Sequence, residues 1–165
     1  MDVFECIKTR RSVRGYTDQK VDSEMLDKIL QSAIWTPSGK NGQPWKFKIV
    51  EDKTIINRLS DLSVYGSWMR TASHFILIFL DKSFSYNYIK DVQSCGAAMQ
   101  NIMLTAHSLG VGSCWIGEIL PKAKDVKSIL NINNDNIELM GIVTLGYKAR
   151  RTLNPGRKEY SSFLI

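Results

Sequence analysis

Two short segments of this sequence carry side chains suited to binding a charged aromatic molecule. Residues 10–14 place three arginines and a serine within five positions, and residues 37–45 form a loop rich in polar residues, Gly and Pro. Guanidinium groups and a hydroxyl suit a phosphate, because they form charge-assisted hydrogen bonds to its oxygens. Loop amides suit a planar heterocycle. The two segments together predict a phosphorylated aromatic cofactor.

The net charge of +6 is concentrated near the two ends of the 165-residue chain. Nine of the 22 Lys and Arg residues lie in two segments without acidic residues, and in the rest of the chain acidic residues outnumber basic ones. The nine are Lys8, Arg10, Arg11, Arg14, Lys148, Arg150, Arg151, Arg157 and Lys158. Charge confined in this way fits a small anionic ligand better than the long footprint of a nucleic acid. We therefore expect no nucleic-acid partner.

The cysteines and the hydropathy pattern indicate where in the cell the protein is expected and which partners are not. Cys6, Cys95 and Cys114 are odd in number, widely spaced and in apolar surroundings, so they favour neither a disulfide framework nor a metal site. The N-terminus has no apolar signal core, and the most apolar strand, at 75–80, is too short to span a bilayer. We expect a cytoplasmic protein with no bound metal and no membrane partner.

Two common catalytic patterns are disfavoured. Gly110 and Gly112 lack the third glycine of a dinucleotide-binding loop, because Trp115 stands at its position, and a helix rather than a strand is predicted before them. His74 and His107 are the only histidines, and neither has the spacing of a zinc site or of a Ser-His-Asp triad. We expect both histidines to be structural.

Hydrophobic periodicity predicts the elements that position these segments. The predicted helices span 2–9, 22–35, 52–62, 92–109 and 121–130, and the predicted strands span 45–50, 74–80, 113–117 and 139–147, the third being a strand or a turn. Helices and strands do not alternate regularly, which favours an α+β class and one domain over 1–165. Apolar residues cover more than one face of the helix at 92–109, which predicts a central position for it.

Four motifs recur in a familiar order and spacing. They are the segment 10–16, the loop 37–45, the glycine-bounded segment 110–117, and Gly146-Tyr147 followed by Arg157-Lys158. Together they resemble the nitroreductase family of FMN-dependent NAD(P)H oxidoreductases in its short form. The resemblance implies an α+β fold with a central antiparallel or mixed sheet flanked by helices. It further implies an intertwined homodimer with two FMN molecules at its interface, in which the apolar helix at 92–109 resembles the central dimer helix.

The resemblance also implies roles for the arginine segment. Arg10 and Ser12, helped by Arg11, would hold the phosphate and ribityl chain of FMN. Arg14 would place positive charge near N1 and the C2 carbonyl of the flavin, where negative charge collects on reduction. The alternative for Arg14 is an exposed arginine without a ligand. Arg157, together with Lys158, resembles the cations of the tail that close over the phosphate.

The other motifs resemble parts of the site that meet the flavin ring. Pro37, Ser38 and Asn41 resemble a loop that reaches the flavin bound mainly by the other subunit. Gln43 either joins this contact or, with the Pro and Trp that follow it, only locks the loop onto its strand. Ile116 and Gly117 resemble the segment that lies against the isoalloxazine and offers a backbone N–H to N5.

The implied activity is a ping-pong reaction, in which NADH or NADPH gives hydride to flavin N5 and a small-molecule acceptor then takes its place. The cofactor performs the chemistry, so no catalytic side chain needs to be named. Nitroaromatics, quinones or flavins are the implied acceptors. Two alternatives remain open: a carrier or sensor that binds flavin, and a specialised reductive enzyme on the same fold.

Overall fold

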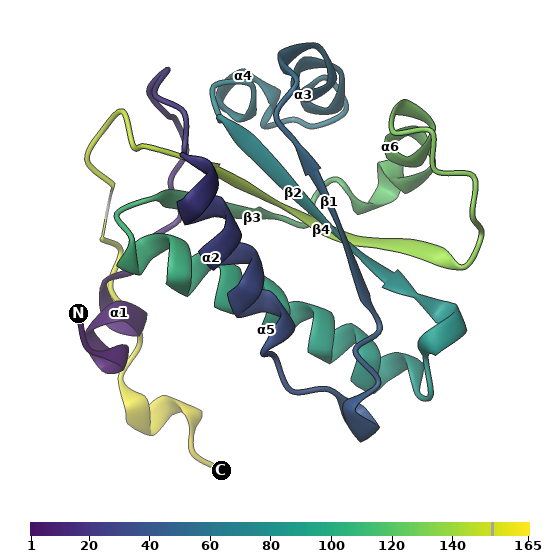
Figure 1. The fold of residues 1–165 in the computed structure, drawn as a ribbon. Coiled ribbons are helices and arrows are strands. Elements are labelled where there is room, and N and C mark those ends of the chain that lie inside the picture. Colours follow the sequence, from purple (N-terminus) through teal and green to yellow (C-terminus); the bar gives the residue numbers. More distant parts are fainter. Residues whose placement is uncertain (153) are drawn as a thin grey trace.

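A four-stranded antiparallel sheet forms the centre of the protein. The computed structural model describes residues 1–152 and 154–165 (Figure 1). The strands are β1 (Trp45–Val50), β2 (His74–Asp81), β3 (Gly112–Ile116) and β4 (Ile137–Gly146), in the order β1-β2-β4-β3. Each neighbouring pair is antiparallel. The sheet and its helices confirm the predicted α+β class.

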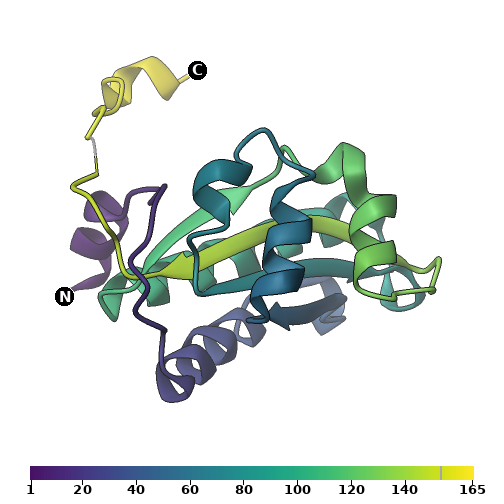
Figure 2. The same cartoon turned by 90° about the horizontal axis from the view of Figure 1, so that it is seen from above.

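Helices cover both faces of this sheet (Figure 2). One layer contains α2 (Ser23–Ile34) and α5 (Tyr88–Ser108), and α1 (Val3–Thr9) packs against α5. The other layer contains α3 (Lys53–Ser60), α4 (Gly66–Met69) and α6 (Ala123–Ile129). Four short 3-10 helices lie at Gly39–Asn41, Lys82–Phe84, Leu120–Lys122 and Tyr160–Phe163, named η1 to η4. An apolar cluster lies on each side of the sheet, so both faces of the sheet bury apolar side chains.

The helix boundaries follow from side-chain caps. Asp2, Asp22 and Asp52 each accept a hydrogen bond from the backbone N–H three residues later, at the starts of α1, α2 and α3. The helix predicted from residue 92 begins earlier, because Asn87 caps it by accepting from the N–H of Lys90. Periodicity detects the buried apolar face of a helix, and Tyr88, Ile89 and Lys90 at the start of α5 are exposed, so they do not extend that pattern.

The buried carboxylate of Asp91 fixes the chain that enters α5. It accepts hydrogen bonds from the Ser85 hydroxyl at 2.7 Å and from the backbone N–H groups of Tyr86 and Asn87, each at 3.1 Å. Asp91 is only 1% exposed, so these three donors replace the water that the carboxylate would otherwise bind. The carboxylate thereby holds the segment 85–87 in place.

The strand β2 and the segment that precedes it pack into the core. All eight residues of β2 are buried, as expected for the strand predicted at 74–80. In the segment before β2, Met69 is fully buried in the core and Trp68 packs against it. The rings of Tyr65 and Trp68 pack on each other with centroids 6.0 Å apart. This group therefore serves packing.

The three cysteines are free and buried. Burial raises the pKa of Cys95 to about 12, with a further contribution from the negative charge of Asp91. A thiol with this pKa stays protonated and unreactive at neutral pH. Across the residues that the structure describes, no helix is both long and apolar enough to cross a membrane.

Candidate functional site

The arginine segment is fastened across the ends of β3 and β4. The backbone N–H of Val13 donates to the carbonyl of Ser113 in β3 at 2.9 Å. Tyr16 forms an antiparallel bridge with Lys148, just after β4. Because these contacts come on both sides of Arg14, the segment has a fixed path over the sheet edge.

The packing of the arginine segment on β3 and β4 explains why two positions in the sequence motifs are glycine. A side chain at Gly112 would come within 2.9 Å of Val13 Cγ2, and one at Gly146 within 2.8 Å of the Tyr16 ring. Both approaches are closer than carbon atoms tolerate, so glycine at these positions makes room for Val13 and Tyr16. Motifs separated by about a hundred residues in the sequence therefore fit together as one unit.

The buried hydroxyl of Tyr16 connects the arginine segment to β4. It lies 2.9 Å from the carbonyl oxygen of Val13 and 2.7 Å from Oγ1 of Thr144 in β4. Burial raises the pKa of Tyr16, so the hydroxyl keeps its proton and remains a donor. Tyr16 belongs to the motif at 10–16, but the sequence does not indicate that its hydroxyl reaches Val13 and Thr144.

A cavity of about 490 Å³ opens beside this segment and joins the two basic ends of the chain. Its lining consists of residues 10–15 together with Arg150, Arg151, Thr152, Pro155 and Arg157. The backbone N–H of Ala149 donates to the carbonyl of Gly15 at 3.1 Å, which brings the C-terminal arginines to the N-terminal ones. Arg150 and Arg151 belong to this cavity, and sequence reasoning did not place them in the site.

The arginines in the cavity repel one another. The pKa of Arg10 is lowered first by its partial burial and then by the neighbouring charges of Arg11 and Arg157. Burial raises the pKa of Cys114 below them, while Arg14, the Ser12 hydroxyl and Arg10 act in the opposite direction. A cavity in which cations are held together in this way favours a bound anion.

Arg11 is engaged by the protein itself. Its guanidinium donates to the carbonyls of Lys8 and Arg10 at 2.7 Å each and to Oδ1 of Asn154 at 3.0 Å. These bonds terminate α1 and attach the C-terminal segment, so Arg11 shapes the cavity wall. Arg157 lines the same cavity, whereas Lys158 is exposed and does not line it.

The loop at 37–43 has an unusual backbone. Lys40, Asn41 and Gln43 all have φ near +50°, at 54°, 54° and 47°, a region that costs energy for residues other than glycine. The Ser38 hydroxyl accepts from the backbone N–H of Gln43 at 3.0 Å and holds this shape. Strain of this kind marks a loop whose shape is maintained by its surroundings.

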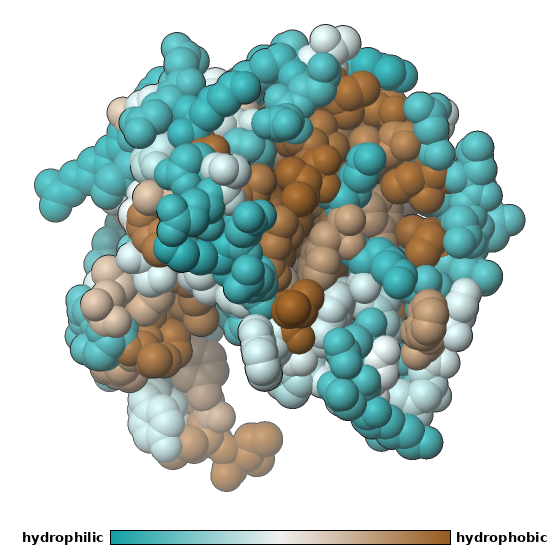
Figure 3. All heavy atoms as spheres, viewed as in Figure 1, coloured by the Kyte–Doolittle hydropathy of each residue, from teal (hydrophilic) through white to brown (hydrophobic). Residues whose placement is uncertain are grey.

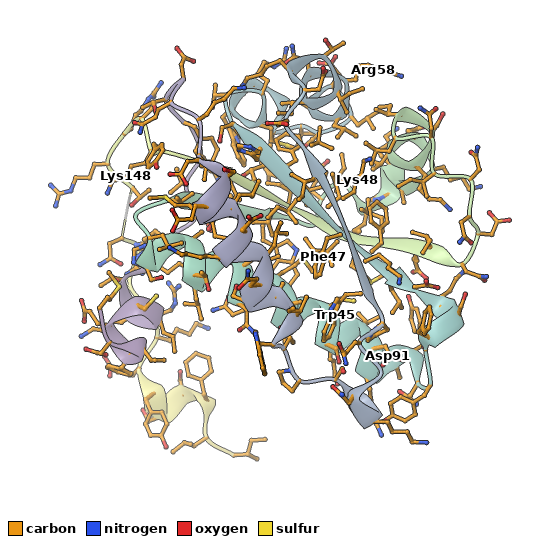
Figure 4. The ribbon with its side chains drawn as sticks, viewed as in Figure 1. Trp45, Phe47, Lys48, Arg58, Asp91 and Lys148 are labelled. Atoms are coloured by element: carbon orange, nitrogen blue, oxygen red, sulfur yellow. The ribbon has the colours of Figure 1, made fainter. Side chains whose placement is uncertain are left out.

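Pro44 and Trp45 anchor the loop. Both are buried, and the carbonyl of Pro44 accepts from the backbone N–H of Asp81 at 2.8 Å. On its other side the loop rests on Tyr86, because a methyl group at Gly39 would overlap the Tyr86 ring. Asp91, which fixes the Tyr86 backbone, lies at this end of α5 in Figure 4.

Within one chain the two halves of the predicted site lie far apart. Pro37, Ser38 and Gly39 line a cavity of about 350 Å³ with Lys90 and other residues at the start of α5. Near the other end of the helix, His107 lines a cavity that shares Arg11 and Val13 with the arginine cavity. His107 comes seventeen positions after Lys90 in the helix, a rise of roughly 25 Å. Figure 4 shows the same separation, with Lys148 and Asp91 at opposite ends of α5.

The remaining predicted site residues lie at the end of β3. Ile116 is buried and closes the strand, and Gly117 follows it exposed. Trp115, which precedes them, is 41% exposed, and its indole sits where Gly96 of α5 and Gly141 of β4 leave space. The strand thus leads from Ser113, which holds Val13 of the cavity wall, to an exposed end at Gly117.

Both histidines have structural partners. Nδ1 of His74 lies 3.0 Å from the Ser73 hydroxyl, and Nε2 of His107 lies 2.9 Å from the Thr9 hydroxyl. The Thr9 hydroxyl donates to the carbonyl of Glu5 at 2.6 Å, so it must accept from His107. His107 thereby attaches α1 to α5.

Comparison with known proteins identifies the family of this chain. The family model described as "Nitroreductase family" matches residues 7–66 and 62–147. A protein of Archaeoglobus fulgidus named "Putative NADH dehydrogenase/NAD(P)H nitroreductase" is 38% identical over 149 residues, covering 87% of this chain and 85% of the relative. An "FMN reductase [NAD(P)H]" of Bacillus subtilis is 26% identical over 174 residues, covering 94% and 70%.

A solved structure has the same fold throughout. It is titled as a "putative nitroreductase in complex with fmn" from Desulfovibrio desulfuricans, with a TM-score of 0.95 and 35% identity, covering 100% of this chain and 96% of the other. Sequence, fold and the docking of the motifs therefore lead to one conclusion. This chain belongs to the nitroreductase family.

Proposed function

We propose that this protein is an FMN-dependent NAD(P)H oxidoreductase that passes hydride through flavin N5 to nitroaromatic, quinone or flavin-type acceptors. The observation that carries the proposal is the arginine cavity, in which both basic ends of the chain meet. Membership of the nitroreductase family and a similar structure titled as an FMN complex support it.

The residues in the cavity fit the phosphate end of FMN. The pKa of Arg10 is lowered by its partial burial and then by the charges of Arg11 and Arg157, and a bound phosphate would offset both effects. The Ser12 hydroxyl lines the same wall and offers a neutral donor. No carboxylate among the described residues forms an ion pair with these arginines, which leaves their charge available to a ligand.

Each group of residues has a distinct task in this proposal. When bound, FMN supplies hydride acceptance and donation at N5. Arg14, exposed at the cavity wall, would hold positive charge beside the ring edge that becomes negative on reduction. The main chain at Ile116 and Gly117 would lie along the ring. No side chain needs to act as acid, base or nucleophile.

A second copy of the chain would complete the site. The loop at 37–43 and the arginine cavity lie at opposite ends of α5, so two α5 helices packed antiparallel would bring the loop of one copy to the cavity of the other. Exposed apolar side chains are consistent with such an intertwined homodimer. They occur on α1 and on the C-terminal segment, which projects from the body (Figures 2 and 3), at Val3, Phe4, Ile7, Tyr160, Phe163, Leu164 and Ile165.

The visible spectrum of the purified protein under anaerobic conditions tests the proposal. We expect a flavin spectrum that bleaches when NADPH or NADH is added and returns with a nitroaromatic or quinone. A protein that takes up no added FMN would overturn the cofactor assignment. Reduction followed by very slow reoxidation with every acceptor class would favour the carrier or sensor alternative instead.

A further inference from the structure

The arginine cavity contains more positive charge than one FMN phosphate balances. Six guanidinium groups line it, from Arg10, Arg11, Arg14, Arg150, Arg151 and Arg157. None of them lies within 4.0 Å of a carboxylate in the part of the chain that the structure describes. A phosphate monoester carries a charge of roughly −1.5 to −2 at neutral pH. Bound FMN would therefore leave a surplus of cations.

The positive charge that FMN would leave unbalanced can be assigned to particular arginines. Arg11 donates to the carbonyls of Lys8 and Arg10 and to Asn154. Arg10, which is partly buried, and Arg157 beside it are the arginines that we assign to the phosphate of FMN. Arg150 and Arg151 are left, and neither side chain forms a hydrogen bond to any described residue.

The fold holds these two arginines at the rim of the cavity. The bridge between Tyr16 and Lys148 and the bond from Ala149 N–H to the Gly15 carbonyl place the chain immediately before them. Both arginines are exposed, so they face a ligand that enters from solvent rather than one enclosed in the site. Lys148, two positions before Arg150, is labelled in Figure 4 and lines the neighbouring cavity that contains His107.

We propose that Arg150 and Arg151 form a second phosphate subsite that binds the pyridine-nucleotide donor and favours NADPH over NADH through the 2′-phosphate. This inference rests on the proposed function. NADH has only a hydroxyl at the position where NADPH has a phosphate, and guanidinium groups bind phosphate through paired, charge-assisted hydrogen bonds. With a volume of about 490 Å³, the cavity has room for a second phosphate beside that of FMN.

Calorimetry on the FMN-loaded protein tests the subsite without turnover. The titrants are NADP⁺, NAD⁺ and adenosine 2′,5′-bisphosphate, and the variants are Arg150→Gln, Arg151→Gln and the double variant. We expect the wild type to bind NADP⁺ about tenfold or more tightly than NAD⁺, and the double variant to lose this preference with its FMN content unchanged. Arg150→Lys and Arg151→Lys should each retain part of it, because the charge remains.

The control and the contrary outcomes separate this inference from the proposed function. Arg58→Gln removes an exposed arginine on α3, away from Lys148 in Figure 4, and should leave both affinities unchanged. Equal affinity for NADP⁺ and NAD⁺ in the wild type, or a preference that survives in the double variant, overturns the inference alone. Loss of FMN from the double variant with unchanged nucleotide affinities overturns it as well, since it assigns these arginines to the cofactor. A protein that takes up no FMN overturns both.

Discussion

The Tyr16 hydroxyl lies 2.9 Å from the carbonyl oxygen of Val13, inside the turn that presents the cavity arginines. Thr144 Oγ1 is 2.7 Å away on its other side, so the same hydroxyl connects the turn to β4. Gly146 leaves the space that the ring occupies. The spacing of Arg10, Ser12 and Arg14 therefore depends on a residue that does not line their cavity.

Tyr16→Phe should weaken both folding and FMN binding. The variant keeps the ring but leaves the Val13 carbonyl and the Thr144 hydroxyl with fewer partners in a buried site, which costs about 1–3 kcal/mol. Urea unfolding and fluorescence titration with FMN measure the two effects. Tyr147→Phe is the matched control, because among the described residues that hydroxyl reaches only Met25 Sδ, at 3.6 Å, and its removal should cost little stability. Equal effects of the two substitutions would argue against a special role for Tyr16.

Arg10→Ala should yield a folded protein that purifies without flavin. Arg10 is the arginine whose burial and cationic neighbours most favour a bound phosphate. Losing a charge-assisted bond of this kind lowers affinity by roughly tenfold or more. The ratio of flavin to protein absorbance, together with the circular dichroism spectrum, reports the result. Full flavin retention would remove Arg10 from the phosphate site.

Arg14→Ala should change the redox potential of the flavin more than its binding. An exposed arginine at the cavity wall contributes modest binding energy, but positive charge near the ring edge stabilises the reduced, negatively charged form. We expect a lower midpoint potential, measured by anaerobic titration with a reference dye. Arg14→Lys should keep most of the potential, and an unchanged potential in Arg14→Ala would leave this arginine without a role at the flavin.

Burial of His74 predicts a loss of stability on acidification. The pKa of His74 is lowered from its ordinary value of 6.5, mainly by burial and opposed by Glu51, whose carboxylate is 3.7 Å from Nε2. The unfolded chain therefore takes up the proton at a higher pH than the folded chain. The stabilisation is fully present above pH 6.5 and is lost as the pH falls through 6.5 towards the lower folded pKa.

Urea unfolding at about pH 7.5 and about pH 5.5, at the same FMN saturation, measures this effect. His74→Gln cannot take up the proton and should show a smaller difference between the two pH values. His107 contributes in the same direction, because burial and the charges of Arg10, Lys148 and Arg11 also lower its pKa. The same pH dependence in the variant and the wild type would exclude His74 as a source.

The sequence indicates the elements of this fold better than the connections between its motifs. Alternation and periodicity are local, so β1 and α2 lie within a residue or two of where they were expected. By contrast, the meeting of Arg150 with Arg10 depends on a bridge between Tyr16 and Lys148, which no local pattern encodes. The left-handed backbone of Lys40 and Asn41 is also invisible to propensity, because the surrounding packing imposes it.

The separation of the two half-sites predicts that two defective chains can restore one working site. Arg10→Ala disables the cavity of its own chain, and Gly39→Ala displaces the loop, since a methyl there would overlap the Tyr86 ring. If each site combines the cavity of one copy with the loop of the other, a mixed dimer of the two variants has one site with both defects and one with neither. We expect about half of the wild-type NADPH oxidase activity and one FMN per dimer.

The reciprocal combination is the matched control for this prediction. A mixed dimer of the wild type with the double variant Arg10→Ala, Gly39→Ala places one defect in each site, so its activity should fall well below half of the wild type. Differently tagged chains, produced together and purified through both tags, give both mixed dimers in defined form. If cavity and loop of one chain served the same site, the order would reverse: the reciprocal dimer would keep half of the activity. The first dimer would then show only the mean of its two parents, because neither of its sites would be intact.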